Sequence, residues 1–237
     1  AWLQECFPDT PVLRVDRDTT RKKNAMQAMY DTVDSGAPCI LVGTQMLAKG
    51  HHFANITLVA VLDADSGLFS PDFRSHERLG QLLTQVAGRS GRGKMAGKVI
   101  LQSHQPDHPL LEVLTQQSYG EYSTLLRKQR KQAELPPFKQ LILVRADAAH
   151  AQNAEAFLQS ARQCAEAIFP SGETVNYLGP LPALMERRNS RHRYVLQISG
   201  GRRSDLNFFL SQLVFELEKL PMARHVRWGV DVDPQEL

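Results

Sequence analysis

The chain has 237 residues, of which 42% are hydrophobic and 22% are charged, and its formal net charge at pH 7 is +3. This balance is typical of a folded globular protein and excludes an intrinsically disordered one. The small positive excess permits nucleic-acid binding without requiring it. The apolar runs fall short of the roughly 20 residues that a membrane helix needs, so we expect a cytoplasmic protein with no membrane partner.

The cysteines Cys6, Cys39 and Cys164 stand far apart in the sequence. Because no CxxC pair occurs, the sequence predicts neither a zinc site nor a disulfide framework. A reducing compartment fits this usage best. Cys39 and Cys164 lie in apolar segments and are predicted to be small buried hydrophobes.

The first 138 residues alternate strand-like and helix-like segments. The chain opens at Ala1 in what looks like the end of a helix, so we expect a fragment whose earlier part is missing. Apolar, β-branched runs predict strands, and apolar residues at helical spacing predict helices. The expected strands are 11–15, 39–42, 58–62 and 99–102, and the expected helices are about 20–34, 75–85, 109–117 and 119–134.

This alternation indicates an α/β domain with a mainly parallel sheet. The runs 39–42 and 58–62 are continuously apolar, as in parallel strands that are buried on both faces. In such sheets, ligands gather in the loops at the carboxyl ends of the strands. We therefore expect functional residues in these loops.

The loop after the 39–42 strand carries groups that suit phosphate. Its sequence, GTQMLAKGHHF, offers a hydroxyl at Thr44, an amide at Gln45, and Lys49 beside Gly50. Phosphate oxygens take most protein–DNA hydrogen bonds, and these groups can donate them. The two adjacent histidines of the loop point apart and have no carboxylate at ligand spacing, so metal binding is not predicted.

Two aspartates, Asp63 and Asp65, follow the 58–62 strand. Carboxylates at a strand end can hold a magnesium ion or cap the exit from strand to loop. The capped exit from strand to loop is the favoured interpretation.

The segment 81–93, QLLTQVAGRSGRG, continues a helix and ends in two arginines, each beside glycines. The arginine fork fits phosphate oxygens, and glycine lets the backbone approach a ligand closely. Gln85 would then position a water, and Arg89 and Arg92 would stabilise charge in a phosphate-transfer site. The alternative is a solvated basic loop at a helix C-terminus, where arginines also complement the dipole.

From Gln140 onward the pattern changes to β-α-β-β-α-β. The expected strands are 141–145, 175–178, 194–198 and 226–232, and the expected helices are 151–168 and 204–220. This is the ferredoxin-like order, in which an antiparallel sheet carries both helices on one face. A basic helix end followed by LPPF predicts the domain boundary between residues 138 and 139.

Arginines gather around the second hairpin of this domain and form the densest positive patch in the sequence. A small sheet with a basic rim can bind a nucleic-acid backbone or an acidic peptide tail. The alternative is loop charge that only keeps the protein soluble. The arginines are Arg187, Arg188, Arg191, Arg193, Arg202 and Arg203.

Several motifs in one order give the chain a family resemblance. GTQMLAKGHHF, the strand that ends in Asp63, and QVAGRSGRG closely resemble motifs V and VI of superfamily 2 helicases. With VLRVDRDTT, QSHQPDHPLL, LPPF and WGVDVDP, the chain resembles the primosomal replication-restart DNA helicases over nearly its whole length. The resemblance implies a partial, RecA-like second helicase lobe at 1–138 and a small α+β ferredoxin-like domain at 139–237.

The resemblance also implies roles for individual residues. In motif VI, Gln85, Arg89 and Arg92 would be catalytic, and the two arginines would reach the triphosphate of ATP. ATP with Mg²⁺ is the implied cofactor, in a site shared with a missing first lobe, and the zinc ligands of the family lie outside this chain. The residues that would couple ATP to DNA are Gly43, Thr44, Gln45, Lys49, Gly50, Asp63, Gly88 and Gly91.

By the same resemblance, the chain is expected to be the C-terminal part of an ATP-dependent 3′–5′ DNA helicase. Such an ATP hydrolase would recognise stalled or branched replication forks and start primosome assembly, and this part alone is expected to be inactive. The implied partners are branched and single-stranded DNA, the single-stranded DNA-binding protein and other primosome proteins. The alternatives are a non-catalytic DNA- and protein-binding platform and a related branch-migration translocase.

Overall fold

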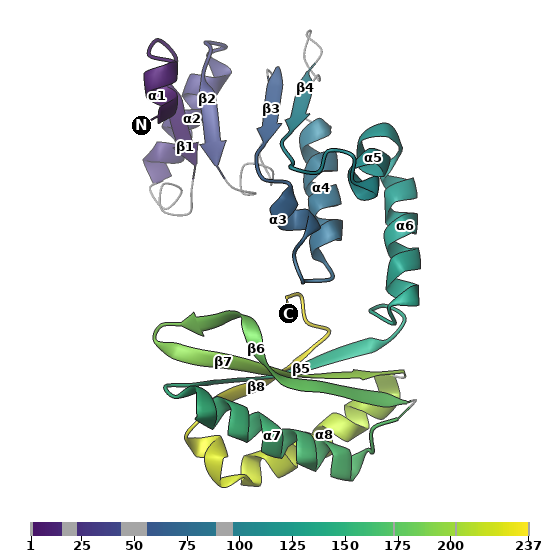
Figure 1. Ribbon diagram of the computed structural model, residues 1–237. Coiled ribbons are helices and arrows are strands. Elements are labelled where there is room, and N and C mark those ends of the chain that lie inside the picture. The colour runs from purple at the N-terminus through teal and green to yellow at the C-terminus, as the bar shows by residue number, and fades with distance from the viewer. Residues whose placement is uncertain are drawn as a thin grey trace. The chain divides into compact units, whose positions relative to one another are not determined.

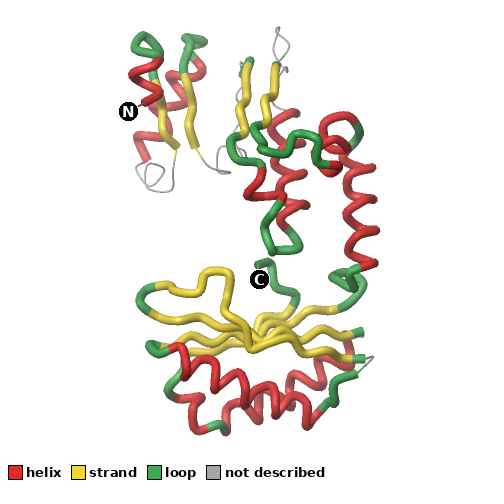
Figure 2. The backbone as a smooth tube through the Cα atoms, in the orientation of Figure 1, coloured by secondary structure: helices red, strands yellow, loops and turns green. Residues whose placement is uncertain are grey.

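The computed structural model describes residues 2–15, 23–43, 56–88, 97–172, 174–201 and 203–236. By its internal contacts the chain divides into two compact units. The first unit contains residues 1–70 and 75–123, and the second contains 71–74 and 124–237. Figure 1 labels the helices and strands of both units, and Figure 2 distinguishes helices, strands and loops by colour.

The first unit contains two small parallel sheets. One pairs β1 (Val12–Val15) with β2 (Ile40–Gly43), and the other pairs β3 (Leu58–Val61) with β4 (Lys98–Leu101). The four strands lie where the sequence predicts them. Among the described residues, however, they form two separate two-stranded sheets and not one larger sheet, because backbone hydrogen bonds join only these two pairs.

The prediction that β2 and β3 are buried on both faces is wrong for these residues. Val42 of β2 is 38% exposed, and in β3 exposed and half-buried residues alternate. On the β1–β2 pair, Met29 of α2 (Lys23–Asp34) packs against Val15 and forms a small core. A strand is buried on both faces only when a layer covers each face.

Helices account for most of the remaining first unit. Besides α2 they are α1 (Trp2–Cys6), α3 (Asp65–Leu68), α4 (Ser75–Ala87) and α5 (Pro109–Gln116). α4 carries the helical part of the 81–93 segment. The helix α6 (Tyr119–Gln132) begins in the first unit and continues in the second. A capping box begins α6, because the Ser118 backbone N–H donates to Glu121 Oε2 at 2.8 Å and the Glu121 N–H donates to Ser118 Oγ at 3.3 Å.

A buried tyrosine joins α4 to the start of α6. Tyr122 is fully buried, and its hydroxyl donates to the His76 carbonyl at 2.6 Å. Burial raises the pKa of Tyr122 to about 12. A Cβ atom at Gly80 of α4 would overlap the Tyr122 ring, so this close approach requires glycine.

The second unit is a four-stranded antiparallel sheet with the strand order β6-β7-β5-β8. The helices α7 (Ala151–Ile168) and α8 (Arg203–Lys219) cover the same face of this sheet (Figure 1). The strands and helices follow the predicted order, with a short 3-10 helix, η2 (Pro221–Arg224), before the last strand. The elements are β5 (Gln140–Ala148), α7 (Ala151–Ile168), β6 (Val175–Arg188), β7 (Arg191–Gly200), α8 (Arg203–Lys219) and β8 (Arg227–Val232).

Alternation along the strands builds the core of the second unit. In β5, Ile142, Val144 and Ala146 belong to one buried cluster with Phe157 of α7 and Leu213 of α8. These β5 residues are spaced by two, as the pleat requires for side chains on one face. The sheet is therefore held to its two helices by a continuous apolar layer.

β6 is ten residues longer than the predicted strand, which ends at Leu178. It runs through Gly179 and the two prolines that follow, and the pairing with β7 shifts register between Leu178 and Leu181. β6 is an edge strand, where proline is tolerated because its missing N–H faces away from the ladder. Pairing with β7 therefore overrides the local signal for a turn.

Residues 71–74 pack within the second unit against α6. Two guanidinium groups lie over the Phe73 ring, that of Arg74 at 5.1 Å and that of Arg130 at 5.2 Å from the ring centroid. Arg130 also donates from Nη2 to the Phe73 carbonyl at 3.3 Å. Part of the basic end of α6 is thus used in cation–π packing.

Two further predictions concern the cysteines and the membrane. Cys39 and Cys164 are only partly buried, so the prediction that both are buried is wrong. Cys6 is exposed. Cys39 lies just outside β2, at the residue before the strand begins. Within the described ranges, no helix is both long enough and apolar enough to cross a membrane.

The substitution Gly80→Ala tests the contact with Tyr122. Alanine normally favours a helix interior over glycine by about 1 kcal/mol. Here we expect destabilisation of about 1–3 kcal/mol, since the added methyl group overpacks a buried ring. Urea unfolding measures this change. In the control Gly120→Ala, the nearest atom is Ser118 Oγ at 3.6 Å, an ordinary contact, so stability is expected to stay equal or rise.

Candidate functional site

Most of the residues predicted from helicase motifs V and VI lie outside the described residues. Their roles in catalysis and in coupling ATP to DNA therefore stay predictions. The motif residues outside the described ranges are Thr44, Gln45, Lys49, Gly50, Arg89, Gly91 and Arg92.

The described residues beside these motifs are exposed. Gly43 is the last residue of β2, so the motif V loop leaves the carboxyl end of a parallel strand. Gln85 is exposed in the last turn of α4, and the Gly88 N–H donates to the Thr84 carbonyl at 3.0 Å just after that helix. The segment with the two predicted arginines therefore begins where α4 ends.

Asp63 caps the exit from β3. Its Oδ1 accepts from the Ser66 N–H at 3.2 Å, and its carbonyl accepts from Ser66 Oγ at 3.0 Å. Asp63 has a positive φ of 55°, a conformation that aspartate tolerates better than most residues. This is the capped exit that the sequence favours over a magnesium site.

Asp65 joins the carboxyl ends of β3 and β4. Its Oδ1 accepts from Ser103 Oγ at 2.6 Å, and its Oδ2 accepts from the His104 N–H at 2.8 Å. His104 Nδ1 lies 2.6 Å from the same Oδ2. One carboxylate thus holds the first two residues of the loop that follows Gln102.

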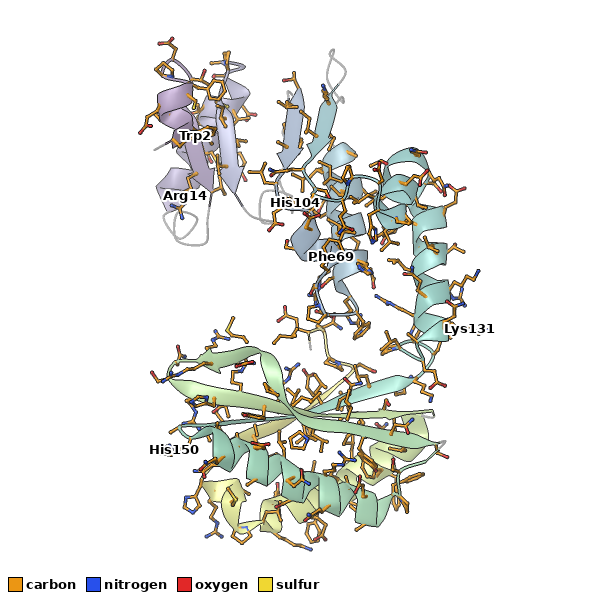
Figure 3. All side chains as sticks on the ribbon, viewed as in Figure 1. Trp2, Arg14, Phe69, His104, Lys131 and His150 are labelled. Carbon is orange, nitrogen blue, oxygen red and sulfur yellow. The ribbon has the colours of Figure 1, made fainter. Side chains whose placement is uncertain are left out.

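These hydrogen bonds alter the acidity of Asp65. The Ser103 hydroxyl, and then the backbone and side chain of His104, lower the pKa of Asp65 to about 2. A carboxylate that accepts several hydrogen bonds is stabilised in its charged form. His104 makes its contacts with Asp65 although its own side chain is 93% exposed (Figure 3).

The sequence interpretation missed Ser103 and His104 as partners of Asp65. The signal was available, because both segments directly follow strands that are predicted to be parallel. Parallel neighbours bring their carboxyl ends to the same edge of a sheet. Among the described residues, no group of three or more His, Cys, Asp and Glu side chains is arranged to hold a metal ion.

The second candidate site is the β6–β7 hairpin, which carries four of the predicted arginines. Arg187 and Arg188 end β6 and are exposed, and within the described part of the chain neither makes an ion pair or a side-chain hydrogen bond. Arg191 is different, since its Nε pairs with Asp147 Oδ1 and its Nη2 donates to the Asp147 carbonyl at 2.8 Å. Arg193 donates from Nη1 to the Met185 carbonyl at 3.4 Å.

For Arg203, the prediction of one continuous arginine patch with the hairpin is wrong. β7 separates the hairpin from Arg203, which begins α8, and Arg202 lies outside the described residues. The ten residues of β7 span roughly 30 Å at about 3.3 Å per residue. The hairpin arginines and the start of α8 therefore lie at opposite ends of one strand.

Together, the two units define a mixed α/β protein with a small C-terminal domain that carries an arginine-rich hairpin. A family model described as the primosomal protein N C-terminal domain matches residues 131–235. This match covers the whole four-stranded sheet together with α7 and α8.

Curated relatives extend the similarity over the first unit as well. The replication restart protein PriA of Haemophilus influenzae is 40% identical over 99% of this chain and 32% of its own length. The PriA proteins of Synechocystis and Bacillus subtilis are 38% and 33% identical, each over 98% of this chain and over 27% and 29% of their own lengths. The chain belongs to the replication restart protein PriA family, and it spans about a third of the length of these relatives.

The substitution Asp65→Asn tests the link between β3 and β4. The pKa of Asp65 lies below its ordinary value of about 3.9, so its carboxylate stabilises the fold above that pH and loses the effect as pH falls to about 2. We expect a lower unfolding temperature for Asp65→Asn at pH 7, and a difference from the unsubstituted protein that shrinks between about pH 4 and pH 2. Calorimetry across this range measures both.

Asp107→Asn is the matched control, because Asp107 is exposed in the loop before α5. It should leave the unfolding temperature unchanged at pH 7. An equal loss in both variants would mean that the hydrogen bonds of Asp65 contribute nothing particular to the fold.

Proposed function

We propose that this chain is the C-terminal part of an ATP-dependent 3′–5′ DNA helicase. The helicase would recognise stalled or branched replication forks and start primosome assembly in the cytoplasm. The observation that carries the proposal is similarity to proteins named for replication restart over 98–99% of the chain. The motifs GTQMLAKGHHF and QVAGRSGRG add the resemblance to helicase motifs V and VI.

The finer description of the fold is part of this proposal. Residues 1–138 would be a RecA-like second lobe, which the parallel pairs β1–β2 and β3–β4 support. Residues 139–237 would be a ferredoxin-like domain, which the order β6-β7-β5-β8 of antiparallel strands supports. The domain boundary between residues 138 and 139 belongs to the same proposal.

The end of α4 fits a role at the phosphates of ATP. Gln85 is exposed in the last helical turn, and the helix ends before the glycine-flanked arginines. Arg89 and Arg92 would stabilise the negative charge that develops on the transferred phosphate, and Gln85 would orient the attacking water. ATP with Mg²⁺ supplies the phosphate bond that is broken, in a site that the remaining length of the protein would complete.

The motif V loop would link that site to DNA. Gly43 delivers the loop to the carboxyl end of β2, where a ligand is expected in a parallel sheet. Thr44, Gln45 and Lys49 would donate to phosphate oxygens of single-stranded DNA, and Gly50 would allow a close backbone approach. Gly88 and Gly91 would give the same freedom to motif VI, and Asp63 would keep the exit of β3 in place.

The second unit would supply a DNA- or partner-binding surface. Arg187 and Arg188 have free guanidinium groups among the described residues, and such groups pair well with phosphate. Arg202 and Arg203 would form a second basic binding site. Its partner would be branched DNA, the single-stranded DNA-binding protein or another primosome protein. Zinc, if the protein uses it, would be held by ligands outside this chain.

Two alternatives share part of this surface. A non-catalytic platform would use the arginines of the second unit without any role for motifs V and VI. A branch-migration translocase would share motifs V and VI, but the match of residues 131–235 to a primosomal domain favours replication restart.

Arg89→Ala and Arg92→Ala test the catalytic role. The test uses a protein in which this chain is joined to the other segments that its full-length relatives contain. There, each substitution is expected to reduce DNA-stimulated ATP hydrolysis by a factor of about 10²–10³ or more. Binding to DNA should change little. This chain by itself is expected to hydrolyse no ATP. Near-normal turnover in both variants would support the non-catalytic platform.

Arg187→Ala/Arg188→Ala tests the role of the hairpin in DNA binding. Affinity of the 237-residue chain for forked DNA is measured by fluorescence anisotropy at several salt concentrations. Each lost phosphate contact lowers the slope of log affinity against log salt by about 0.9, so the double variant should lose roughly 2 from the slope.

Lys128→Ala/Lys131→Ala is the matched control for this measurement. It removes the same charge from the exposed face of α6 in the same unit. We expect it to leave the slope almost unchanged. An equal decrease in both double variants would mean that only total charge matters and that the hairpin makes no specific contact.

A further inference from the structure

Near its end, the edge strand β6 separates from β7 and forms a bulge of four residues. Pro182 pairs with Tyr194, and the next pair is Arg187 with His192. Residues 183–186 of β6 therefore face the single residue Arg193 of β7. Figure 2 shows β6 bowed away from β7 in this part of the sheet.

The bulge presents two adjacent apolar side chains to solvent. Leu184 is 54% exposed and Met185 is 56% exposed, whereas the preceding Ala183 is buried. The buried Ala183 thus anchors the start of the bulge, while the side chains of Leu184 and Met185 are exposed to solvent. Burying apolar surface is favourable, so these two adjacent side chains would gain stability by inserting into an apolar environment of a partner.

Two side-chain contacts and a tight turn fix the turn end of the hairpin. Arg191 pairs with Asp147 of β5, and Arg193 donates to the Met185 carbonyl at 3.4 Å. Asn189 and Ser190 form the two-residue connection with φ values of 50° and 61°, the sign that a type I′ turn requires at both positions. The bulge is therefore preorganised, and binding would cost it little conformational entropy.

Free positive charge lies directly beside the apolar pair. Arg187 and Arg188 are exposed and follow Met185 after one residue, Glu186. Proteins that kink duplex DNA combine these two features, because an apolar side chain such as Leu or Met enters between base pairs while arginines neutralise the nearby phosphates. A protein partner of acidic character would use the arginines but would not need an apolar pair that projects from a strand edge.

Resting on the DNA binding proposed above, we propose that Leu184 and Met185 form a wedge that enters between base pairs at the branch point of forked DNA. Arg187 and Arg188 hold the phosphates on the duplex side of that point. The step from duplex to single strand suits such a wedge, since a base pair there has a stacked neighbour on only one side. The bulge would thus recognise the position of the branch, whereas the arginines alone recognise only charge.

The test uses the 237-residue chain and forked DNA that carries 2-aminopurine next to the branch, because the fluorescence of this base rises when it unstacks. At saturating protein, the unsubstituted chain is expected to raise the fluorescence. Leu184→Ala/Met185→Ala is expected to lose most of this increase while the salt dependence of binding stays unchanged. Leu178→Ala/Leu181→Ala is the matched control, since both leucines are exposed on the paired part of β6, and it should keep the full signal.

The failures of this inference and of the proposed DNA binding are distinguishable. Steep salt-dependent binding with no fluorescence increase, or with the same increase in the wedge variant, would overturn the wedge and leave DNA binding in place. Binding without salt dependence, or no binding, would overturn both. A wedge variant that loses a protein partner but keeps the full DNA signal would also overturn the proposal. Equal unfolding temperatures of the three proteins would verify that the substitutions leave the fold intact.

Discussion

The pairing of β7 with both β5 and β6 is the constraint on which the second unit depends. Every residue of β5 has a partner on β7, and the alternation that follows places Ile142, Val144 and Ala146 against the two helices. The same pairing, with the Arg191–Asp147 ion pair at its end, anchors the hairpin that carries Arg187 and Arg188. Core and candidate interface are therefore two consequences of one register. A shift of one residue would turn the apolar face outward and remove both together.

In the first unit, a single carboxylate has a comparable role on a smaller scale. Asp65 accepts hydrogen bonds from Ser103 and His104, and so it connects the ends of two parallel strands that are distant in sequence. The edge that it stabilises is the kind of edge where α/β proteins bind their ligands. Tyr122 has a similar role in helix packing, because its ring occupies space that only a glycine at position 80 leaves free. These contacts fix the carboxyl ends of β3 and β4 and the packing of α4 against α6.

Local patterns were sufficient to predict most helices and strands. The helix Ala151–Ile168 agrees at both ends with the prediction, since its apolar spacing is strong and Pro170 follows closely. β6 was predicted too short, because Gly179 and Pro180 are a local turn signal that pairing with β7 overrides. Burial of β2 and β3 was predicted too high, because an apolar run shows that a strand can be buried, whereas the neighbouring layers decide whether it is. For the site, the capped exit at Asp63 was predictable from its place after a strand, but the Ser103 and His104 contacts of Asp65 were not recognised.

The sequence by itself determined the class of secondary structure, the change of architecture near residue 140 and the family, because ordered motifs and periodicity are properties of the chain alone. Only the tertiary structure decided which basic residues are available. The length of β7 separates Arg203 from the hairpin arginines, although they are close in sequence. Arg191 is paired with Asp147, while Arg187 and Arg188 stay free among the described residues. Only the tertiary structure also exposed Leu184 and Met185, since their exposure arises from a register shift between two strands. Long-range pairing sets such features, and it depends on residues that local sequence does not contain.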